Sequence, residues 1–409
     1  MPQASSQTLL RPHYPALDGL RGLAVLAVCL THYCTLAWPS LHDVFFWGFS
    51  TVDLFFVLSG FLITGILLDT RPFPNFFRNF YIRRALRILP VFLVVWAVLF
   101  LIAAFLHPAW NWYHLSFLVY LGNLYMPAGA AGYHTDPSYF FYIAASGHRF
   151  YVTIGHLWTL CQEEQFYLVW PLVIALVPNR KLLFRLCLTG ALAVLVLRIY
   201  LATHADPRLL AGDLLYYNPI TRFDSHLIGA ALAISLRNPS SPRVPHPLQP
   251  HRKGWGLPLN PTGQPRPSLC LWLIVAPTAL FLALQLTLGR RSPLNHHNPI
   301  VSTIGFTLDC IASTGLLLLC LDPATRTARV LSHTLPRALG RVSYAFYLFH
   351  FLPFQFFINQ RPRLESHHLL FLIPTVALGL SYLAATLSDR FLEHPILRLK
   401  NTLAPNPSA

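Results

Sequence analysis

The stretch "LDGLRGLAVLAVCLTH", from Leu17 to His32, has the composition of a membrane-spanning helix but contains an aspartate, an arginine and a histidine. Arg21 and His32 are eleven residues apart. At ~100° and ~1.5 Å per residue they share one helix face and lie ~16 Å apart along the axis. An arginine near a helix end often snorkels toward the membrane surface. Because a histidine lies deeper on the same face, a functional role for Arg21 is as well supported as snorkelling.

The composition extends this prediction to the whole chain. Hydrophobic residues make up 54% of the 409 residues, charged residues only 11%, and the mean hydropathy is +0.49. A soluble domain has about 25% charged residues. Apolar runs near the ~20 residues needed to cross a bilayer recur throughout. We therefore predict an all-α, polytopic transmembrane helix bundle of about ten spans. The predicted spans are 17–38, 44–68, 85–107, 156–178, 182–203, 220–237, 269–289, 300–321, 338–359 and 368–389.

The basic residues predict the orientation of these spans. Cytoplasmic loops of membrane proteins carry an excess of Lys and Arg. The basic segments alternate cleanly only if the short apolar piece at 114–127 does not cross the membrane, which places both termini in the cytoplasm. The region 114–155 is then extracytoplasmic, with part of it dipping into the membrane or lying on its surface.

This topology divides the chain into one membrane domain with two tails. The predicted parts are a cytoplasmic N-terminal tail at 1–16, a transmembrane domain at 17–391 and a cytoplasmic C-terminal tail at 392–409. Within the domain, 238–268 is rich in proline and basic residues and is predicted to be a cytoplasmic loop without a packed core. The N-terminal apolar run is interpreted as a retained first span rather than a cleaved signal peptide.

The charge and the cysteines argue against a nucleic-acid-binding protein, a metal-site protein and a disulfide-rich protein. The net charge is +15, from 30 Lys and Arg against 15 Asp and Glu, yet no basic tail or soluble basic domain is visible. Positive cytoplasmic loops explain that balance better than nucleic-acid binding. The seven cysteines show no paired metal-ligand spacing, so we expect small buried side chains and neither a metal site nor a disulfide framework.

An ionisable residue within a span is costly and indicates either a functional site or a packed structural pair. In "VDLFFVLSGFLIT", Asp53 needs a cationic or hydrogen-bonding partner, so a structural and a chemical role are equally open. Ser59 and Gly60 in the same segment are compatible with close helix packing.

The segment "YIRRALRILP" places arginines at the cytoplasmic end of the third span. Arg84 and Arg87 are three residues apart and share a helix face, whereas Arg83 points elsewhere. Simple anchoring by positive residues is one interpretation. The other is a fork for phosphate groups, because guanidinium groups bind phosphates bidentately.

Two later segments hold further titratable groups. In "GHLWTLCQEEQFYLVWPL", Glu163 and Glu164 lie ~100° apart around the helix, so one can face a cavity while the other braces a neighbouring helix. "RVSYAFYLFH" places His350 midway along a late span. The arginine fork thus lies at the inner face, and the acids and histidines lie deeper. This division suits a group delivered from a phosphate-rich cytoplasmic donor to an acceptor on the other face.

Together these motifs resemble the acyltransferase-3 family of integral-membrane acyltransferases, over nearly the whole chain. "LDGLRGLAVLAVCLTH" is similar to the family's first helix, with its basic residue and histidine at Arg21 and His32. "RRALR" is similar to the Arg-x-x-Arg motif, at Arg84 and Arg87. "LWTLCQEEQFYLVWPL" resembles the family's Glu-Glu-Gln-Phe-Tyr segment, with Thr159 where serine is usual. "SYAFYLFH" and "FLEHPILRL" also fit.

The resemblance implies transfer of an acyl group, often acetyl, from cytoplasmic acyl-CoA to a hydroxyl of an extracytoplasmic glycan, in the bacterial inner membrane. Histidine suits proton removal near neutral pH. We therefore expect His32 to be the general base or a transient acyl carrier. Asp53 or Glu164 would orient its imidazole. Arg21 would hold the donor or stabilise developing negative charge.

The remaining expected roles concern binding. Arg84 and Arg87 would bind the CoA phosphates, and Glu163, His350 and Trp158 would contact the substrate. We expect no tightly bound cofactor, with acyl-CoA, most simply acetyl-CoA, as co-substrate. The expected partners are the lipid bilayer and a glycan or lipid-linked glycan, with no nucleic acid.

Two other classes compete with this hypothesis. A secondary transporter also places acids and histidines at mid-membrane, although the two halves of this chain show no similarity to each other. A non-catalytic membrane scaffold is the third alternative, but a scaffold gains nothing from ionisable residues inside the membrane.

Overall fold

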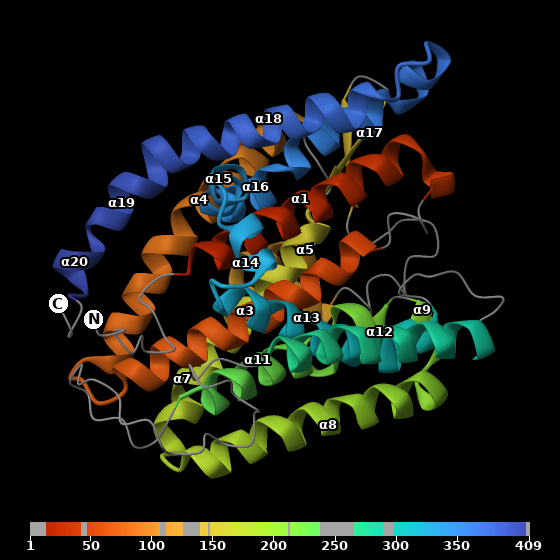
Figure 1. Cartoon of the computed structure of the whole chain (residues 1–409). Helices are drawn as coiled ribbons and strands as arrows, with labels where there is room; N and C mark the ends of the chain where they lie inside the picture. Colours follow the sequence, from red (N-terminus) through yellow and green to blue (C-terminus); the bar gives the residue numbers. More distant parts are fainter. Residues whose placement is uncertain are drawn as a thin grey trace.

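The computed structural model describes residues 14–41, 47–106, 112–125, 140–145, 148–211, 213–237, 266–288 and 298–405. Helices account for all the regular structure in these ranges apart from one β-hairpin, which confirms the predicted helical bundle. Helix α18 (Leu372–Ser388) and helix α8 (Arg180–His204) lie on opposite faces of the bundle, with α1 (Pro15–Ala37) and α3 (Trp47–Thr70) between them (Figure 1).

Seven helical segments among the described residues are long and apolar enough to cross a membrane. Each corresponds to one of the predicted spans. They are Pro15–Ala37 (α1), Ser50–Thr70 (within α3), Phe76–Leu101 (within α4, Phe76–Leu106), Arg180–His204 (α8), Pro267–Thr287 (within α12, Pro267–Leu288), Val301–Leu321 (the π-helix η5, Val301–Gly305, with α13, Phe306–Leu321) and Leu372–Leu403.

The other three predicted spans correspond to shorter or interrupted helices. Helix α7 (Trp158–Leu176) has 19 residues and α11 (Phe223–Ser235) has 13. The continuous span expected at 338–359 is instead three helices, α15 (Thr334–Arg341), α16 (Ser343–Phe349) and α17 (Phe351–Ser366). The total of ten spans and the cytoplasmic placement of the termini therefore stay predictions.

The sequence explains the interruption between α16 and α17. Pro353 is the third residue of α17 and has no N–H to donate to the carbonyl of Phe349. A helix cannot continue regularly across such a position, so the chain bends at His350.

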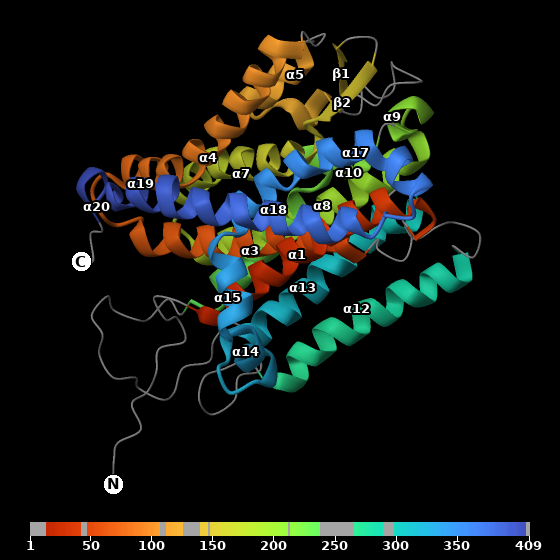
Figure 2. The ribbon, with the colours of Figure 1, turned by 90° about the horizontal axis from the view of Figure 1, so that it is seen from above.

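The short apolar piece at 114–127 is not a spanning helix where it is described. Helix α5 covers Trp112–Ser116, the 3-10 turn η2 covers Phe117–Val119, and Tyr120 then has a positive φ of 59°. Downstream, strands β1 (Phe140–Ala145) and β2 (His148–Thr153) pair antiparallel, with Phe140 opposite Thr153. Figure 2 shows α5 and this hairpin together, on the side of the bundle away from α12.

Short elements complete the described chain. They are η1 (Pro39–Leu41), η3 (Gly155–Leu157), α9 (Pro207–Ala211), α10 (Leu214–Tyr217), η4 (Pro219–Thr221), α14 (Arg326–Leu331), η6 (the π-helix Asp389–Glu393), α19 (His394–Arg398) and α20 (Lys400–Leu403). The predicted C-terminal tail is thus helical as far as Leu403. Most of the predicted loop at 238–268 lies outside the described residues.

Glycines allow the central helices to approach closely. A Cβ on Gly60 would lie 2.1 Å from the carbonyl oxygen of His226, and one on Gly229 would lie 2.0 Å from that of Val57, so α3 and α11 pack backbone against backbone. In the first helix, a Cβ on Gly22 would lie 2.3 Å from the carbonyl oxygen of Pro336. Gly22 therefore lets α15 lie directly against α1.

All seven cysteines are buried and free, as expected for small core side chains. The core has two parts. One is built mainly on α1, α3, α4, α7 and α16, and the other joins the start of α1 and the middle of α3 to α13 and α14. The first part surrounds the polar groups described next.

Candidate functional site

A cavity of about 300 Å³ lies between α1, α3, α4, α7 and α16. Its walls are mostly apolar, with charged groups on three of the five helices. Arg21 comes from α1, Arg84 and Arg87 from α4, and Glu163 from α7. Among the described lining residues, three arginines therefore face a single carboxylate. The structure brings together all three residues that the sequence assigned to the donor.

Helical spacing explains why two arginines of α4 line the cavity and a third does not. Arg84 and Arg87 are one turn apart and both line the cavity. Arg83 points away, and its Nε donates to the carbonyl oxygen of Ala404 at 2.9 Å. The predicted division of the "RRALR" arginines is confirmed, because Arg83 holds the C-terminal segment instead.

Glu163 is held in place inside the cavity. Its carboxylate accepts hydrogen bonds from the hydroxyls of Ser59, at 2.6 Å, and Tyr167, at 3.1 Å. The guanidinium of Arg84 lies over the ring of Tyr167, 4.9 Å from its centroid. Glu163 therefore both faces the cavity and ties α7 to α3, and Ser59 is its partner rather than a packing residue.

Glu164 is not among the residues that line this cavity. Its Oε1 is buried and has no hydrogen-bond partner among the described residues. The two glutamates diverge, as their spacing predicted. Trp158 does not line the cavity either; its indole packs at 4.8 Å from the ring of Tyr216 and 5.8 Å from that of Phe56. The substrate contact of Trp158 stays a prediction.

Arg87 has a partner that its own sequence motif does not predict. Glu393, at the end of η6, lies 3.5 Å from its guanidinium, and the glutamate side chain is only 2% exposed. The signal was present in "FLEHPILRL", where a single acid follows two apolar residues and stands two residues before a proline. The C-terminal helices thus contact the arginine fork from outside the cavity.

The two histidines predicted from separate motifs lie together. His32 Nδ1 is 3.1 Å from His350 Nε2, and the rings are stacked with centroids 5.1 Å apart. Phe351 and Phe354 pack edge-on against His32, and His156 stacks on Phe351 at 4.0 Å. The first and ninth predicted spans therefore meet at an imidazole pair in an aromatic pocket.

Tyr347 connects the histidine pair with the cavity. It lines the cavity, and its ring centroid is 5.3 Å from that of His350. Its hydroxyl donates to the carbonyl oxygen of His156 at 2.9 Å and accepts from Thr159 at 2.8 Å. The cavity therefore carries arginines on α1 and α4, and its Tyr347 wall adjoins His350, one member of the imidazole pair.

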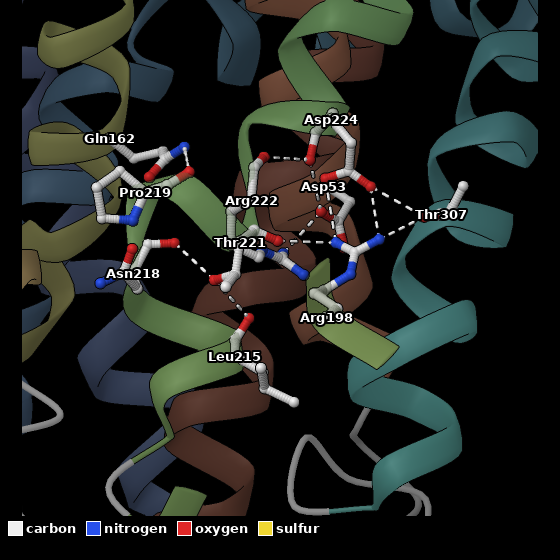
Figure 3. Close-up of polar contacts among 11 residues, drawn as sticks. Asp53, Gln162, Arg198, Leu215, Asn218, Pro219, Thr221, Arg222, Asp224 and Thr307 are labelled. Carbon is white, nitrogen blue, oxygen red and sulfur yellow. Dashed lines mark hydrogen bonds and ion pairs between the residues drawn. The ribbon is translucent and has the colours of Figure 1, made fainter. Parts of the chain in front are cut away.

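Asp53 has a different partner from the one predicted for catalysis. Its carboxylate accepts from Arg222 at 2.7 Å and from Ser225 at 3.3 Å, and its side chain is 2% exposed (Figure 3). Arg222 also lies over the ring of Phe306, 3.8 Å from its centroid. The expectation that Asp53 orients His32 is corrected, because an ion pair between α3 and the start of α11 occupies its carboxylate.

A second ion pair stands beside the first. Arg198 on α8 binds Asp224 through both terminal nitrogens, at 3.1 and 2.6 Å, and also donates to the carbonyl oxygen of Thr221 at 2.9 Å. The hydroxyl of Thr307 joins the same carboxylate at 2.9 Å. Figure 3 shows the two arginines and two aspartates side by side. This paired cluster joins α3, α8, α11 and α13, with cations and anions in equal number.

The fold and the site define a class, a polytopic helical membrane protein with an arginine-rich cavity beside a pair of imidazoles. Comparison with protein families narrows this further. The model of the acyltransferase-3 family, described as "Acyltransferase domain", matches residues 14–388. The chain belongs to this family, as its motifs predicted.

Curated relatives agree with this assignment. The chain is 29% identical over 400 residues to the peptidoglycan O-acetyltransferase OatA of Listeria monocytogenes, covering 94% of this chain and 56% of the relative. It is 29% identical over 397 residues to the putative peptidoglycan O-acetyltransferase YrhL of Bacillus subtilis, covering 94% and 55%. The O-acetyltransferase OatA of Staphylococcus aureus is 27% identical over 411 residues, with 95% and 58% covered. The chain spans about half the length of these relatives. No solved structure matches.

Proposed function

We propose that this protein is a membrane O-acyltransferase that moves an acyl group, in the simplest case acetyl, from cytoplasmic acyl-CoA to a hydroxyl of an extracytoplasmic cell-envelope glycan. The observation that carries the proposal is the cavity, where three arginines face one carboxylate and whose Tyr347 wall adjoins the bonded histidines. Membership of an acyltransferase family supports it.

The arginines fit the donor. Coenzyme A carries three phosphate groups, and guanidinium forks bind phosphate oxygens with paired, charge-assisted hydrogen bonds. Arg84 and Arg87 present such groups one turn apart, and Arg21 faces them from α1. The apolar walls between them suit the uncharged arm of the coenzyme. In this proposal the donor enters at the arginines and points its thioester toward Tyr347.

The histidine pair fits the chemistry. A sugar hydroxyl is a weak nucleophile until a base removes its proton, and imidazole suits that role near neutral pH. His32 takes the hydroxyl proton while the oxygen attacks the thioester carbonyl carbon. The carbon–sulfur bond then breaks, and the thiolate recovers the proton from the imidazolium. Alternatively, the acyl group could pass from the thioester to His32 and then from His32 to the hydroxyl, with the same overall products.

The acceptor is proposed from the named activities of the relatives. Two are named for the O-acetylation of peptidoglycan, so their acceptors are envelope glycans. A multi-pass protein of the bacterial inner membrane would meet acyl-CoA on one side and such a glycan on the other. His32 and His350, on α1 and at the α16–α17 bend, would lie where the two substrates meet.

Radiolabelled acetyl-CoA tests this function. Membranes that contain the wild-type chain should fix label covalently on envelope glycan, and His32→Ala should reduce the rate about 10²- to 10⁴-fold, the usual contribution of a general base. Equal amounts of folded protein, measured by gel filtration in detergent, provide the control. Uptake of label into sealed vesicles without covalent transfer would identify a transporter instead.

A further inference from the structure

His350 lies at the bend between α16 and α17 and is held there from two sides. The hydroxyl of Tyr33, on α1, donates to the His350 carbonyl oxygen at 2.5 Å and lies 2.7 Å from the hydroxyl of Ser381 on α18. The residue is fully buried. Its backbone is therefore fixed by the same helix that carries His32, so the two imidazoles are held in register.

The contacts of the two ring nitrogens of His350 determine its tautomer. Nδ1 meets the carbonyl oxygen of Tyr347, which lies in the last turn of α16, where helix carbonyls lack partners within the helix. A carbonyl oxygen can only accept, so Nδ1 carries the proton. The other nitrogen of neutral His350, Nε2, is then an acceptor.

This assignment carries over to His32. Its Nδ1 lies 3.1 Å from His350 Nε2, and a bond between them needs one donor. Since His350 Nε2 accepts, His32 Nδ1 must donate, and the lone pair of neutral His32 is on Nε2. We propose that His350 is the positioning residue of His32: it holds His32 in the Nδ1-protonated tautomer, with Nε2 as the base, and, by accepting the Nδ1 proton, shares the positive charge that His32 acquires. This inference rests on the proposed acyl transfer.

The dyad accounts for the proton throughout the reaction. When the acceptor hydroxyl gives its proton to His32 Nε2, the His32 ring becomes cationic, and its Nδ1 proton can move to His350 Nε2. The positive charge then lies on His350, whose Nδ1–H faces the Tyr347 carbonyl. Both shifts reverse when the thiolate leaves and takes the proton from Nε2. No bond other than these N–H bonds changes in the dyad.

A neutral partner suits this location. In a serine-protease triad a buried carboxylate holds the histidine tautomer and stabilises the imidazolium. A carboxylate within the membrane needs its own cation, as the pairing of Asp53 with Arg222 illustrates. An imidazole accepts the same hydrogen bond without a resting charge, and the aromatic rings of Phe351 and Phe354 can then pack against the pair.

Matched substitutions of His350 test the proposal. The amide of a glutamine reaches the position of Nε2 and can accept from His32, whereas the shorter asparagine reaches only the position of Nδ1. His350→Gln should keep kcat within about tenfold of wild type. His350→Asn and His350→Phe should lower kcat by about a hundredfold or more, the scale associated with a misplaced histidine tautomer. The KM for acetyl-CoA should not change, because the arginines bind the donor.

Two kinetic outcomes would overturn the proposal. An equal fall in kcat in the glutamine and asparagine variants, at equal yields of folded protein, would mean that His32 does not need a hydrogen-bond acceptor at the Nε2 position of residue 350. A raised KM for the glycan acceptor with an unchanged kcat would return His350 to the substrate-contact role that the sequence suggested.

The tautomer can also be measured without any transfer assay. Nitrogen-15 NMR of histidine-labelled protein in lipid bilayers, with the His32 signal assigned from His32→Ala, should show a protonated Nδ1 and an unprotonated Nε2 in wild type. The Nδ1 proton should persist in His350→Gln and exchange between the two nitrogens in His350→Asn. A wild-type His32 protonated on Nε2 would refute the positioning role. Failure of label transfer by the wild type would refute the proposed function instead, so the two failures are distinguishable.

Discussion

The paired cluster and the cavity both hold arginines inside the bundle, but they balance charge differently. In the paired cluster, Arg198 and Arg222 each bind an aspartate, and all four side chains are buried. Around the cavity, three arginines face Glu163, which is already bound by Ser59 and Tyr167. The first arrangement pairs each arginine with an aspartate of the chain, whereas the second keeps an excess of positive charge around an open volume.

The comparison separates structural from functional charges. Both clusters satisfy the rule that a charge inside a membrane needs a partner. In the paired cluster the partner of each arginine comes from the chain, so the charges join four helices. In the cavity the negative charge of Glu163 does not balance the three arginines, and an anionic substrate would supply the remaining negative charge. Three predictions test this contrast, ordered from the largest expected effect.

Breaking the paired cluster should cost stability. Asp224→Leu leaves Arg198 buried without its carboxylate, and removing one member of a buried ion pair costs about 3–5 kcal/mol. We expect a large fall in the yield and melting temperature of the protein in detergent. The double variant Arg198→Met/Asp224→Leu should recover most of the loss, since apolar replacement of a whole pair is often neutral. A single variant that melts like wild type would contradict the structural role.

Removing the cavity arginines should weaken the binding of the donor. Arg84→Ala and Arg87→Ala should each raise the KM for acetyl-CoA about tenfold or more, because a hydrogen bond to a charged group contributes roughly 1.5–3 kcal/mol. Arg83→Ala is the matched control, since Arg83 binds the Ala404 carbonyl outside the cavity. If all three variants showed the wild-type dependence on acetyl-CoA, the arginines would serve only as membrane anchors.

The smallest expected effect on donor binding concerns Glu393, which contacts Arg87 from outside the cavity. Glu393→Gln keeps the size of the side chain but removes the charge 3.5 Å from Arg87. The cavity then becomes more positive, so the KM for acetyl-CoA should fall about threefold, as expected for a change below ~1 kcal/mol at a partly exposed arginine. The KM measured at two salt concentrations should converge with that of wild type at high salt. A raised KM would show that Glu393 positions Arg87 rather than weakening its charge.

Periodicity predicted the parts of the site that lie on one helix. Arg84 and Arg87 face the cavity and Arg83 does not, because helical spacing alone decides which neighbours share a face. The divergence of Glu163 and Glu164 follows from the same rule. Composition and apolar run length likewise predicted the helical bundle. The shortened and interrupted helices were missed, because a span of suitable hydropathy can still bend at a proline such as Pro353.

Partners across helices could not be read in this way. Asp53 was expected beside a histidine but lies beside Arg222, 169 residues away in the chain. His350 was expected to contact substrate, which stays a prediction, and its bond to His32, 318 residues away in the chain, was not expected. Nothing in a local pattern ranks one distant cation or imidazole above another. The packing of α1 against the α16–α17 bend, and of α3 against α11, makes that choice.

By itself, then, the sequence determined that this chain is a helical membrane protein of the acyltransferase-3 family and that Arg21 and His32 lie on one face of its first helix. Only the tertiary structure decided that Arg21 joins the cavity arginines and that His32 joins His350. The physical reason is that a helix face follows from a fixed rotation per residue. A contact between helices depends instead on where glycines allow close packing, on where helices bend and on which of several charged groups form ion pairs.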